Sequence, residues 1–278
     1  MRILVTGASS FVGVHFCSLA ASQGHDVLGL WRNTPMLVDG VKCITADVTS
    51  FSPAKVDVVV HLAAKVMAKD AREQNRKMMD AVLEWGFPVV YASSTMVHWP
   101  RKNAYAESRV EDEARVRASG KPWLIVRPCA PWGPAHATHK PTHVESFATL
   151  AKLVRRAPFV PVPGSADVLR QPVHVHDFNG AILALLERGV WNAAYDAGGP
   201  EAISVREIIK RIAAASNDGD RRVRILEVPE VLAKIGGRFL KNFSADTLAT
   251  FATDDTADPT PLQAASGITP RRFDAAGL

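Results

Sequence analysis

Short apolar runs alternate with helical patterns over the first 130 residues, and this alternation constrains the fold more than any other feature. Several runs are rich in valine, isoleucine and leucine without polar alternation, which is typical of strands buried on both faces. This order predicts a parallel sheet flanked by helices. The apolar runs are ILVT (3–6), DVLGLW (26–31), KCIT (42–45), DVVVHLA (57–63), PVVYAS (88–93) and WLIVRP (123–128), and the helical patterns cover about 11–23, 69–85 and 105–119.

The pattern changes after Pro128. Residues 129–145 contain three prolines and three histidines, which predicts a long loop. Beyond this loop, the sequence predicts helices at about 145–157, 177–188 and 204–215 and a strand near 223–228.

The composition excludes several classes of protein. With 278 residues, of which 47% are hydrophobic and 22% charged, the chain can bury a large core without disulfides. Its three cysteines lie far apart, so we expect neither a disulfide framework nor a zinc site, and a cytoplasmic location. No apolar run approaches the roughly 20 residues that span a bilayer, so we expect no membrane partner.

The net charge of +5 does not by itself identify a partner. The basic residues are scattered and form no stripe interleaved with aromatic residues, so we expect no nucleic-acid partner. An anionic small molecule, such as a phosphorylated cofactor, accounts for the charge equally well, and so does an ordinary solvated surface.

The segment VTGASSFVG joins the first predicted strand to the first predicted helix. Gly7 suits the tight turn, and Gly13 allows the helix to pack closely on the sheet. The amides at the helix start, from Ser10 through Phe11 to Val12, then face a pyrophosphate. Ser10 stands where a third glycine is expected, so its Cβ narrows the approach while its hydroxyl can donate to a phosphate. The loop predicts a dinucleotide site, with a glycine turn that binds no ligand as the alternative.

The end of the second predicted strand bears on which dinucleotide is bound. No acidic residue occurs from Leu30 to Pro35 to accept the ribose hydroxyls of NAD. Arg32 can pair instead with a 2′-phosphate, which favours NADP over NAD, although it can also be an ordinary surface arginine. Asp47 and Val48 follow the third predicted strand, where a carboxylate can accept from the adenine amino group.

In NAYAESR, residues 103–109, Tyr105 and Arg109 are four positions apart and share one face of a predicted helix. Reduction of a carbonyl needs a proton for the developing alkoxide, and a tyrosine beside a fixed cation is a suitable donor. Ser94 ends a predicted strand, so its hydroxyl can polarise the same oxygen. We predict these three residues as catalytic; the alternative is a turn-capping serine and a half-buried helix tyrosine.

Together these segments resemble the extended short-chain dehydrogenase/reductase family of NAD(P)-dependent epimerases, dehydratases and ketoreductases. The resemblance implies an α/β fold, a Rossmann-type doubly wound parallel sheet with a small C-terminal substrate-binding lobe. Residues 1–130 would form the dinucleotide-binding domain and 131–278 mainly the lobe, with residues near 165–190 returning to the first domain. The segments that carry it are TGASSFVG, ADVT, VVHLAA, YASSTMV, YAESR, LIVRPCAPWGP, RQPVHVHDF, YDAGGPEAISVREI and DPTPLQAASGITPRRF.

The resemblance also implies roles for single residues. Asn75 would support the active site, and Arg170 matches an arginine that grips the diphosphate of nucleotide sugars. Trp132 would line the pocket or belong to the core. The residues placed beside the cofactor are Leu62, Ala63, Ala64 and Arg109, and those placed beside the substrate are Ser94, Thr95, Tyr105, Trp132 and Arg170.

The sequence departs from the family pattern at informative positions. Arg109 stands where the family has lysine; arginine keeps the charge but is bulkier and never loses a proton. Ala130 stands where nucleotide-sugar members commonly carry asparagine, and SSTMV lacks the Asp-Glu pair of the dehydratases. We predict an NADP-preferring oxidoreductase or epimerase that acts on a secondary alcohol or ketone, with a nucleotide sugar as one candidate. The alternative is a non-catalytic NADP(H)-binding redox sensor or scaffold.

The histidines and two helices leave further alternatives open. The spacing of His136, His139 and His143 brings imidazoles together only on a helix, and nearby prolines favour a loop, so we predict no metal. His174 and His176 alternate as on a short strand. The helices near 69–85 and 105–119 could pair two subunits into a homodimer or pack into the core.

Overall fold

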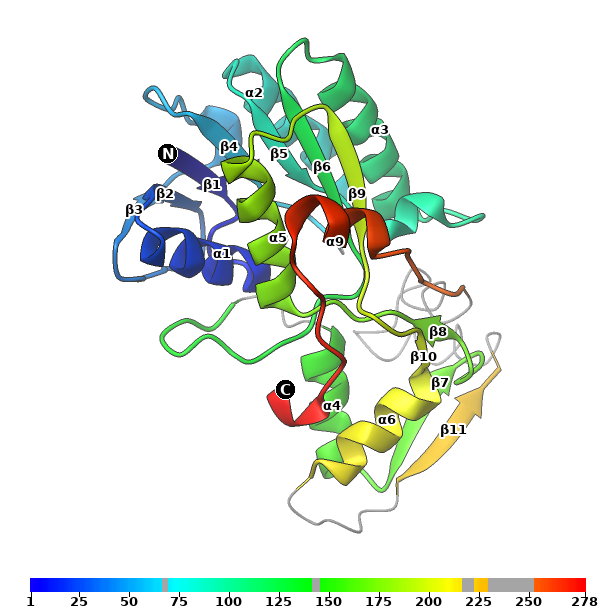
Figure 1. The fold of residues 1–278 in the computed structure, drawn as a ribbon. Coiled ribbons are helices and arrows are strands. Elements are labelled where there is room, and N and C mark those ends of the chain that lie inside the picture. Colours follow the sequence, from blue (N-terminus) through cyan, green and yellow to red (C-terminus); the bar gives the residue numbers. More distant parts are fainter. Residues whose placement is uncertain (67–69, 142–145, 217–222, 230–252) are drawn as a thin grey trace.

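The computed structural model of the chain describes residues 1–66, 70–141, 146–216, 223–229 and 253–278. A sheet flanked by helices forms the upper part in Figure 1, and a smaller lobe lies below it. His143 lies outside the described residues.

Seven parallel strands form the central sheet, in the order β3-β2-β1-β4-β5-β6-β9. The chain runs from β1 first towards β3 and then back towards β9, so the strand order reverses beside β1. Ligands of such sheets bind at the carboxyl ends of the strands next to this reversal. The Rossmann-type prediction is confirmed. The strands are β1 (Arg2–Thr6), β2 (Asp26–Trp31), β3 (Val41–Thr45), β4 (Val58–His61), β5 (Val89–Ala92), β6 (Trp123–Pro128) and β9 (Ala193–Ala197).

Helices cover both faces of this sheet. On one face α1 and α5 bury Val14 and Phe178 against Val5 and Val60; on the other, α2 and α3 bury Met79 and Val116 around Leu4 and Val59. In the described part of the chain no helix combines the length and apolarity needed to cross a bilayer. The helices are α1 (Phe11–Ser22), α2 (Ala71–Glu84), α3 (Ala104–Ala118), α5 (Val175–Glu187) and α9 (Thr260–Ser266), the last packed on α5 and β9, with short 3-10 helices η1 (Val48–Ser50) and η2 (Thr95–His98).

The lobe has a core of its own. Amphipathic α4 and α6 bury Phe147, Val154 and Ile208, with Phe273 from the chain end, over two small sheets. One sheet pairs β11 with β7 in parallel and the other pairs β10 with β8 antiparallel. The elements are α4 (Ser146–Arg156), β7 (Phe159–Pro163), β8 (Leu169–Arg170), β10 (Ile203–Ser204), α6 (Val205–Ala214), β11 (Arg224–Val228) and η3 (Ala275–Gly277).

Several elements differ from the sequence prediction. The prediction that His174 and His176 lie on a strand is wrong, because His174 caps α5 and accepts from the His176 amide at 3.2 Å. The strands β7 and β9 were not predicted. Their sequences, FVPVP and AAYDA, are rich in proline or alanine, and each is a strand because a neighbouring strand pairs with it.

Candidate active site

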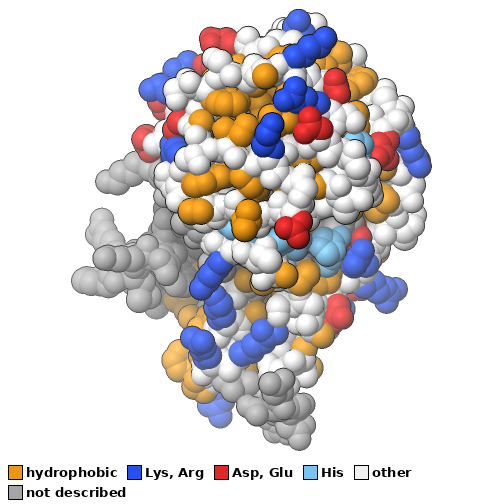
Figure 2. Space-filling view, turned by 90° about the vertical axis from the view of Figure 1, so that its left-hand side faces the viewer, with side chains coloured by type: hydrophobic (Ala, Val, Ile, Leu, Met, Phe, Trp, Pro, Cys, Tyr) orange, Lys and Arg blue, Asp and Glu red, His pale blue; other side chains and the backbone are white. Residues whose placement is uncertain are grey.

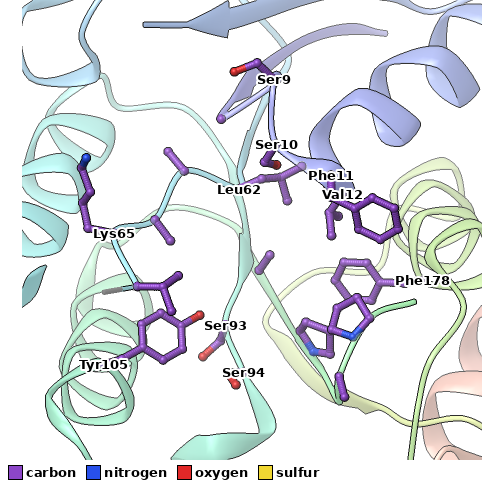
Figure 3. A pocket seen from close by; sticks show the side chains of 18 of the residues that line it. Ser9, Ser10, Phe11, Val12, Leu62, Lys65, Ser93, Ser94, Tyr105 and Phe178 are labelled. Atoms are coloured by element: carbon purple, nitrogen blue, oxygen red, sulfur yellow. The ribbon is translucent and has the colours of Figure 1, made fainter. Parts of the chain in front are cut away.

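A cavity of about 790 Å³ opens at the carboxyl ends of the central strands and is lined by residues of both the sheet and the lobe (Figure 3). This volume suits a ligand of cofactor size. Of the predicted site residues, Gly13, Thr95, Arg109 and Trp132 do not line it. The predicted residues that do are Gly7, Ser10, Phe11, Val12, Arg32, Asp47, Val48, Leu62, Ala63, Ala64, Ser94, Tyr105 and Arg170.

The two glycines of the turn after β1 are required by close backbone contacts. Gly7 has φ +67°, and a Cβ there would lie 2.6 Å from the Ala63 nitrogen. A Cβ on Gly13 would lie 2.3 Å from the Gly7 carbonyl oxygen, so this glycine lets α1 approach the turn. The Ser10 hydroxyl accepts from the Gly13 amide at 3.0 Å and serves as the N-cap of α1.

The start of α1 fits the diphosphate of a dinucleotide. Phe11 and Val12 line the cavity, and within the described part of the chain no hydrogen bond uses their backbone amides. Unpaired amides at a helix start, together with the positive end of the helix dipole, attract an anion.

The far end of the cavity holds an ion pair. Arg32 Nη1 donates to Asp47 Oδ2 at 2.7 Å, and this bond is the main reason why the pKa of Asp47 falls to about 2. The other Asp47 oxygen accepts from the amide and hydroxyl of Thr49. Arg32 therefore shares its charge with Asp47 at the cavity wall.

Tyr105 and Ser94 come from different elements and face the same cavity (Figure 3). Tyr105 lies in the first turn of α3, which Asn103 caps by accepting from the Ala106 amide at 2.8 Å. Ser94 caps η2, and its hydroxyl oxygen accepts from the Met96 amide at 3.2 Å. Because that bond uses the oxygen as acceptor, the hydroxyl proton stays available for a substrate oxygen.

Arg109 lies beneath Tyr105, away from the cavity. Only 1% of its surface is exposed, and its guanidinium carbon is 4.9 Å from the Tyr105 ring centre and 5.2 Å from that of Tyr91. Nη2 lies 3.6 Å from Asp112, and Nε has no partner within the described residues. Arg109 thus supplies a positive charge behind the tyrosine, and its predicted contact with the cofactor stays a prediction.

On the lobe side, the predicted residues are distributed between the cavity and the interior. Trp132 packs in the lobe core against Phe273 and His174. Thr95 lies behind the wall, where its hydroxyl donates to Asp255 at 2.7 Å. Arg170 lines the cavity, and its Nη1 donates to the carbonyl oxygens of Leu169 at 2.6 Å and Thr253 at 2.9 Å.

The proline-rich loop is tied to the glycine turn and α1 by histidines. His139 Nε2 lies 2.8 Å from the Ser9 carbonyl oxygen, and His136 Nε2 lies 3.0 Å from the Ser18 hydroxyl. His15 stacks edge-on against His136 and His176. Histidine side chains gather between the upper and lower parts of the molecule in Figure 2. Among the described residues no group of three such side chains is arranged to hold a metal ion.

Sequence reasoning missed several residues of the cavity. Lys65 follows LAA directly, so the strand-end position of that segment could have identified it. No local sequence pattern identified Asp255 or Phe178 as cavity residues, because both lie far along the chain from the other residues of the site. The lobe adds an apolar wall formed by Phe147, Leu150, Val205 and Ile208.

A glycine turn, a helix start with unpaired amides and a tyrosine on one cavity define the class of NAD(P)-dependent oxidoreductases built on a Rossmann-type sheet. The model of the NAD dependent epimerase/dehydratase family matches residues 3–198, so the chain belongs to this family. The description of this family is of NAD-dependent epimerases and dehydratases.

Two curated relatives are similar over much of the chain. A ceramide reductase of Caulobacter vibrioides (strain NA1000 / CB15N) is 27% identical over 200 residues, 66% of this chain and 60% of the reductase, so the match spans less than two thirds of that relative. A dTDP-4-dehydro-6-deoxy-D-allose reductase of Streptomyces bikiniensis is 23% identical over 270 residues, which cover 79% of this chain and 82% of that enzyme.

Solved structures share the fold. UDP-glucose 4-epimerase from Bifidobacterium longum, in complex with NAD+ and UDP, superposes with a TM-score of 0.78 at 17% identity. The superposition covers 100% of this chain and 96% of the epimerase chain. MoeE5 in complex with UDP-glucose and NAD gives 0.76 at 20% identity with the same coverage. At these identities the likeness establishes the fold alone.

Proposed function

We propose that the protein transfers hydride between a nicotinamide dinucleotide and a secondary alcohol or ketone, as a reductase or an epimerase. The observation that carries the proposal is that Tyr105 and Ser94 open onto the same cavity as the helix start that fits the diphosphate. The bound dinucleotide would supply or accept the hydride.

The residues of the chain have separate tasks in this reaction. The amides of Phe11 and Val12 hold the diphosphate, and Ala63 and Ala64 line the cavity beside it. The Tyr105 hydroxyl gives a proton to the substrate oxygen on reduction and takes it back on oxidation. Ser94 donates a hydrogen bond to the same oxygen and stabilises the charge that develops there.

We propose a nucleotide sugar as the first substrate class to test. A sugar reductase among the relatives and epimerases among the structural neighbours support this choice. Arg170 lies on the lobe side, where a substrate diphosphate would meet a cation.

We propose NADP as the preferred form of the cofactor, with NAD as the alternative that the family supports. The argument for NADP is that Arg32 lines the cavity just after β2 and that no acidic residue occurs from Leu30 to Pro35. The Asp47 carboxylate opposes this preference, because it already pairs with Arg32.

The test is Tyr105→Phe. We expect this variant to bind the dinucleotide like the parent protein and to lose at least about 100-fold in turnover, because only the proton donor is removed. Tyr195→Phe, in β9 and outside the cavity, is the matched control and should keep its activity.

A second candidate is the non-catalytic NADP(H)-binding protein, and the burial of Arg109 favours it. A parent protein that binds the dinucleotide but turns over no carbonyl or alcohol substrate would support this candidate. Equal turnover in the parent and Tyr105→Phe would contradict the role of Tyr105.

A further inference from the structure

The guanidinium of Arg109 is buried on the side of Tyr105 that faces away from the cavity, so in this position it does not contact a cofactor bound there. Its guanidinium lies between two tyrosine rings and beside Asp112, whose side chain is also almost completely buried. Arg109 is absent from the residues that line the cavity. To reach a ligand, this side chain would have to leave its stacking partners and its ion pair, which would destabilise the fold.

Three other cations line the cavity, and two of them are already engaged. Arg32 is paired with Asp47 at 2.7 Å. Arg170 donates to two backbone carbonyl oxygens on the lobe side. The third is Lys65, and among the described residues no hydrogen bond or ion pair engages its ammonium group.

The backbone of Lys65 is held firmly next to the predicted reaction centre. The Asn75 side chain accepts from the Lys65 amide at 2.8 Å and donates to the Lys65 carbonyl oxygen at 3.0 Å. Asn75 also donates to the Ser108 hydroxyl at 3.2 Å, and that hydroxyl donates to the Tyr105 carbonyl oxygen at 2.8 Å. This chain of bonds links Lys65 to the first turn of α3, and so to the Tyr105 end of the cavity.

The cavity wall that carries Lys65 faces the diphosphate site. In Figure 3 Lys65 and Tyr105 lie on the side of the pocket opposite Phe11 and Val12, at the start of α1. A dinucleotide whose diphosphate rests on those amides would have its nicotinamide half between α1 and this wall. The lysine stem is long and flexible, and its ammonium has three donors for ribose or phosphate oxygens.

We propose that Lys65 binds the nicotinamide half of the dinucleotide and supplies there the positive charge that Arg109 cannot bring into the cavity. This inference rests on the proposed function, because it needs the dinucleotide in this cavity. The role requires a charge and a donor, and it does not require the lysine to lose a proton.

The experiment is calorimetric titration of the full chain with NADPH, NADH, ADP-ribose and AMP. The variants are Lys65→Met, which removes the charge, and Lys65→Arg, which keeps it. The matched control is Lys121→Met, an exposed lysine before β6 that does not line the cavity. Circular dichroism and a urea titration confirm that each variant is folded.

Loss of one charge-assisted hydrogen bond should raise the Kd of Lys65→Met for the tightest-binding dinucleotide and for ADP-ribose at least about 10-fold. AMP, which lacks the nicotinamide half, should bind unchanged. Lys65→Arg should stay within about threefold of the parent, and Lys121→Met should match it. An unchanged Kd for ADP-ribose in Lys65→Met, or an equal loss for AMP, would overturn the assignment.

Failure of the inference and failure of the proposed function give different results. If the parent turns over substrate and Lys65→Met binds the dinucleotide normally, only the proposed role of Lys65 is refuted. If the parent binds the dinucleotide, Lys65→Met weakens this binding and no substrate is turned over, only the proposed reaction is refuted. A parent that binds neither dinucleotide nor ADP-ribose would overturn both.

Discussion

Replacing Arg109 by methionine removes a guanidinium from the interior of the half that contains the seven-stranded sheet, and it keeps most of the aliphatic stem. The guanidinium contacts the rings of Tyr91 and Tyr105 and lies 3.6 Å from Asp112. The variant therefore loses two cation–π contacts and part of the charge compensation of a buried carboxylate.

The expected cost is about 3 kcal/mol of the free energy of unfolding. Removing one partner of a buried ion pair costs about 3 to 5 kcal/mol, and desolvated cation–π contacts add about 1 kcal/mol each. The total is reduced because Asp112 keeps the Tyr91 hydroxyl at 3.2 Å and Arg115 at 3.3 Å. Arg109→Lys keeps the charge and should cost about 1 kcal/mol.

The loss of unfolding free energy in Arg109→Met should also grow as the pH rises. Burial raises the pKa of the Asp112 carboxyl, and Arg109 opposes that rise, so the variant raises this pKa further. Above the pKa of the unfolded carboxyl, the native state then keeps a proton that the unfolded state has lost, and this disfavours the native state as pH rises. Urea unfolding of the parent and of Arg109→Met at pH 5 and pH 8 measures both effects.

The double variant Arg109→Met/Asp112→Asn is the control for this account. Removing the unpaired charge should recover about 1 kcal/mol or more relative to Arg109→Met alone. The reasoning is refuted if Arg109→Met loses less than about 1 kcal/mol, or if its loss is the same at both pH values.

Three more changes test the site and its surroundings. Gly13→Ala should abolish dinucleotide binding in a titration and lower stability by at least about 2 kcal/mol, because a Cβ there meets the Gly7 oxygen at 2.3 Å. Gly180→Ala, in α5 with only ordinary contacts, should be neutral or slightly stabilising, and equal effects would contradict the packing argument. Burial, with His176 beside it, lowers the pKa of His15 to about 4. The unfolded state therefore takes up a proton first as pH falls below about 6.5, and His15 alone should contribute about 2 kcal/mol to the drop in stability between pH 7.5 and pH 5. His15→Gln should flatten this drop in urea titrations, and an unchanged slope would contradict the assignment. Arg32→Ala should weaken NADPH binding about 10-fold and leave NADH binding unchanged, whereas equal losses would show that Arg32 does not read the 2′-phosphate.

The fold was predictable wherever local pattern and chain order carry the information. Six of the seven central strands coincide with the runs that the sequence predicted as strands, and the glycine turn lies between a strand and a helix. β9 was not predictable, because AAYDA becomes a strand only through its pairing with β6. In addition, α5 packs on α1, and α9 packs on α5 and β9, by long-range contacts that no local pattern encodes.

The sequence alone determined that Ser94, Tyr105 and the start of α1 would meet, because the carboxyl ends of parallel strands share one edge of a sheet. It also determined that Tyr105 and Arg109 would share a face of α3. Only the tertiary structure decided how deep each side chain would lie. Periodicity specifies the direction in which a residue points, whereas burial depends on what packs over it. Tyr91 and Asp112 enclose Arg109 in this way, whereas the ammonium group of Lys65, on the cavity wall, pairs with none of the described residues.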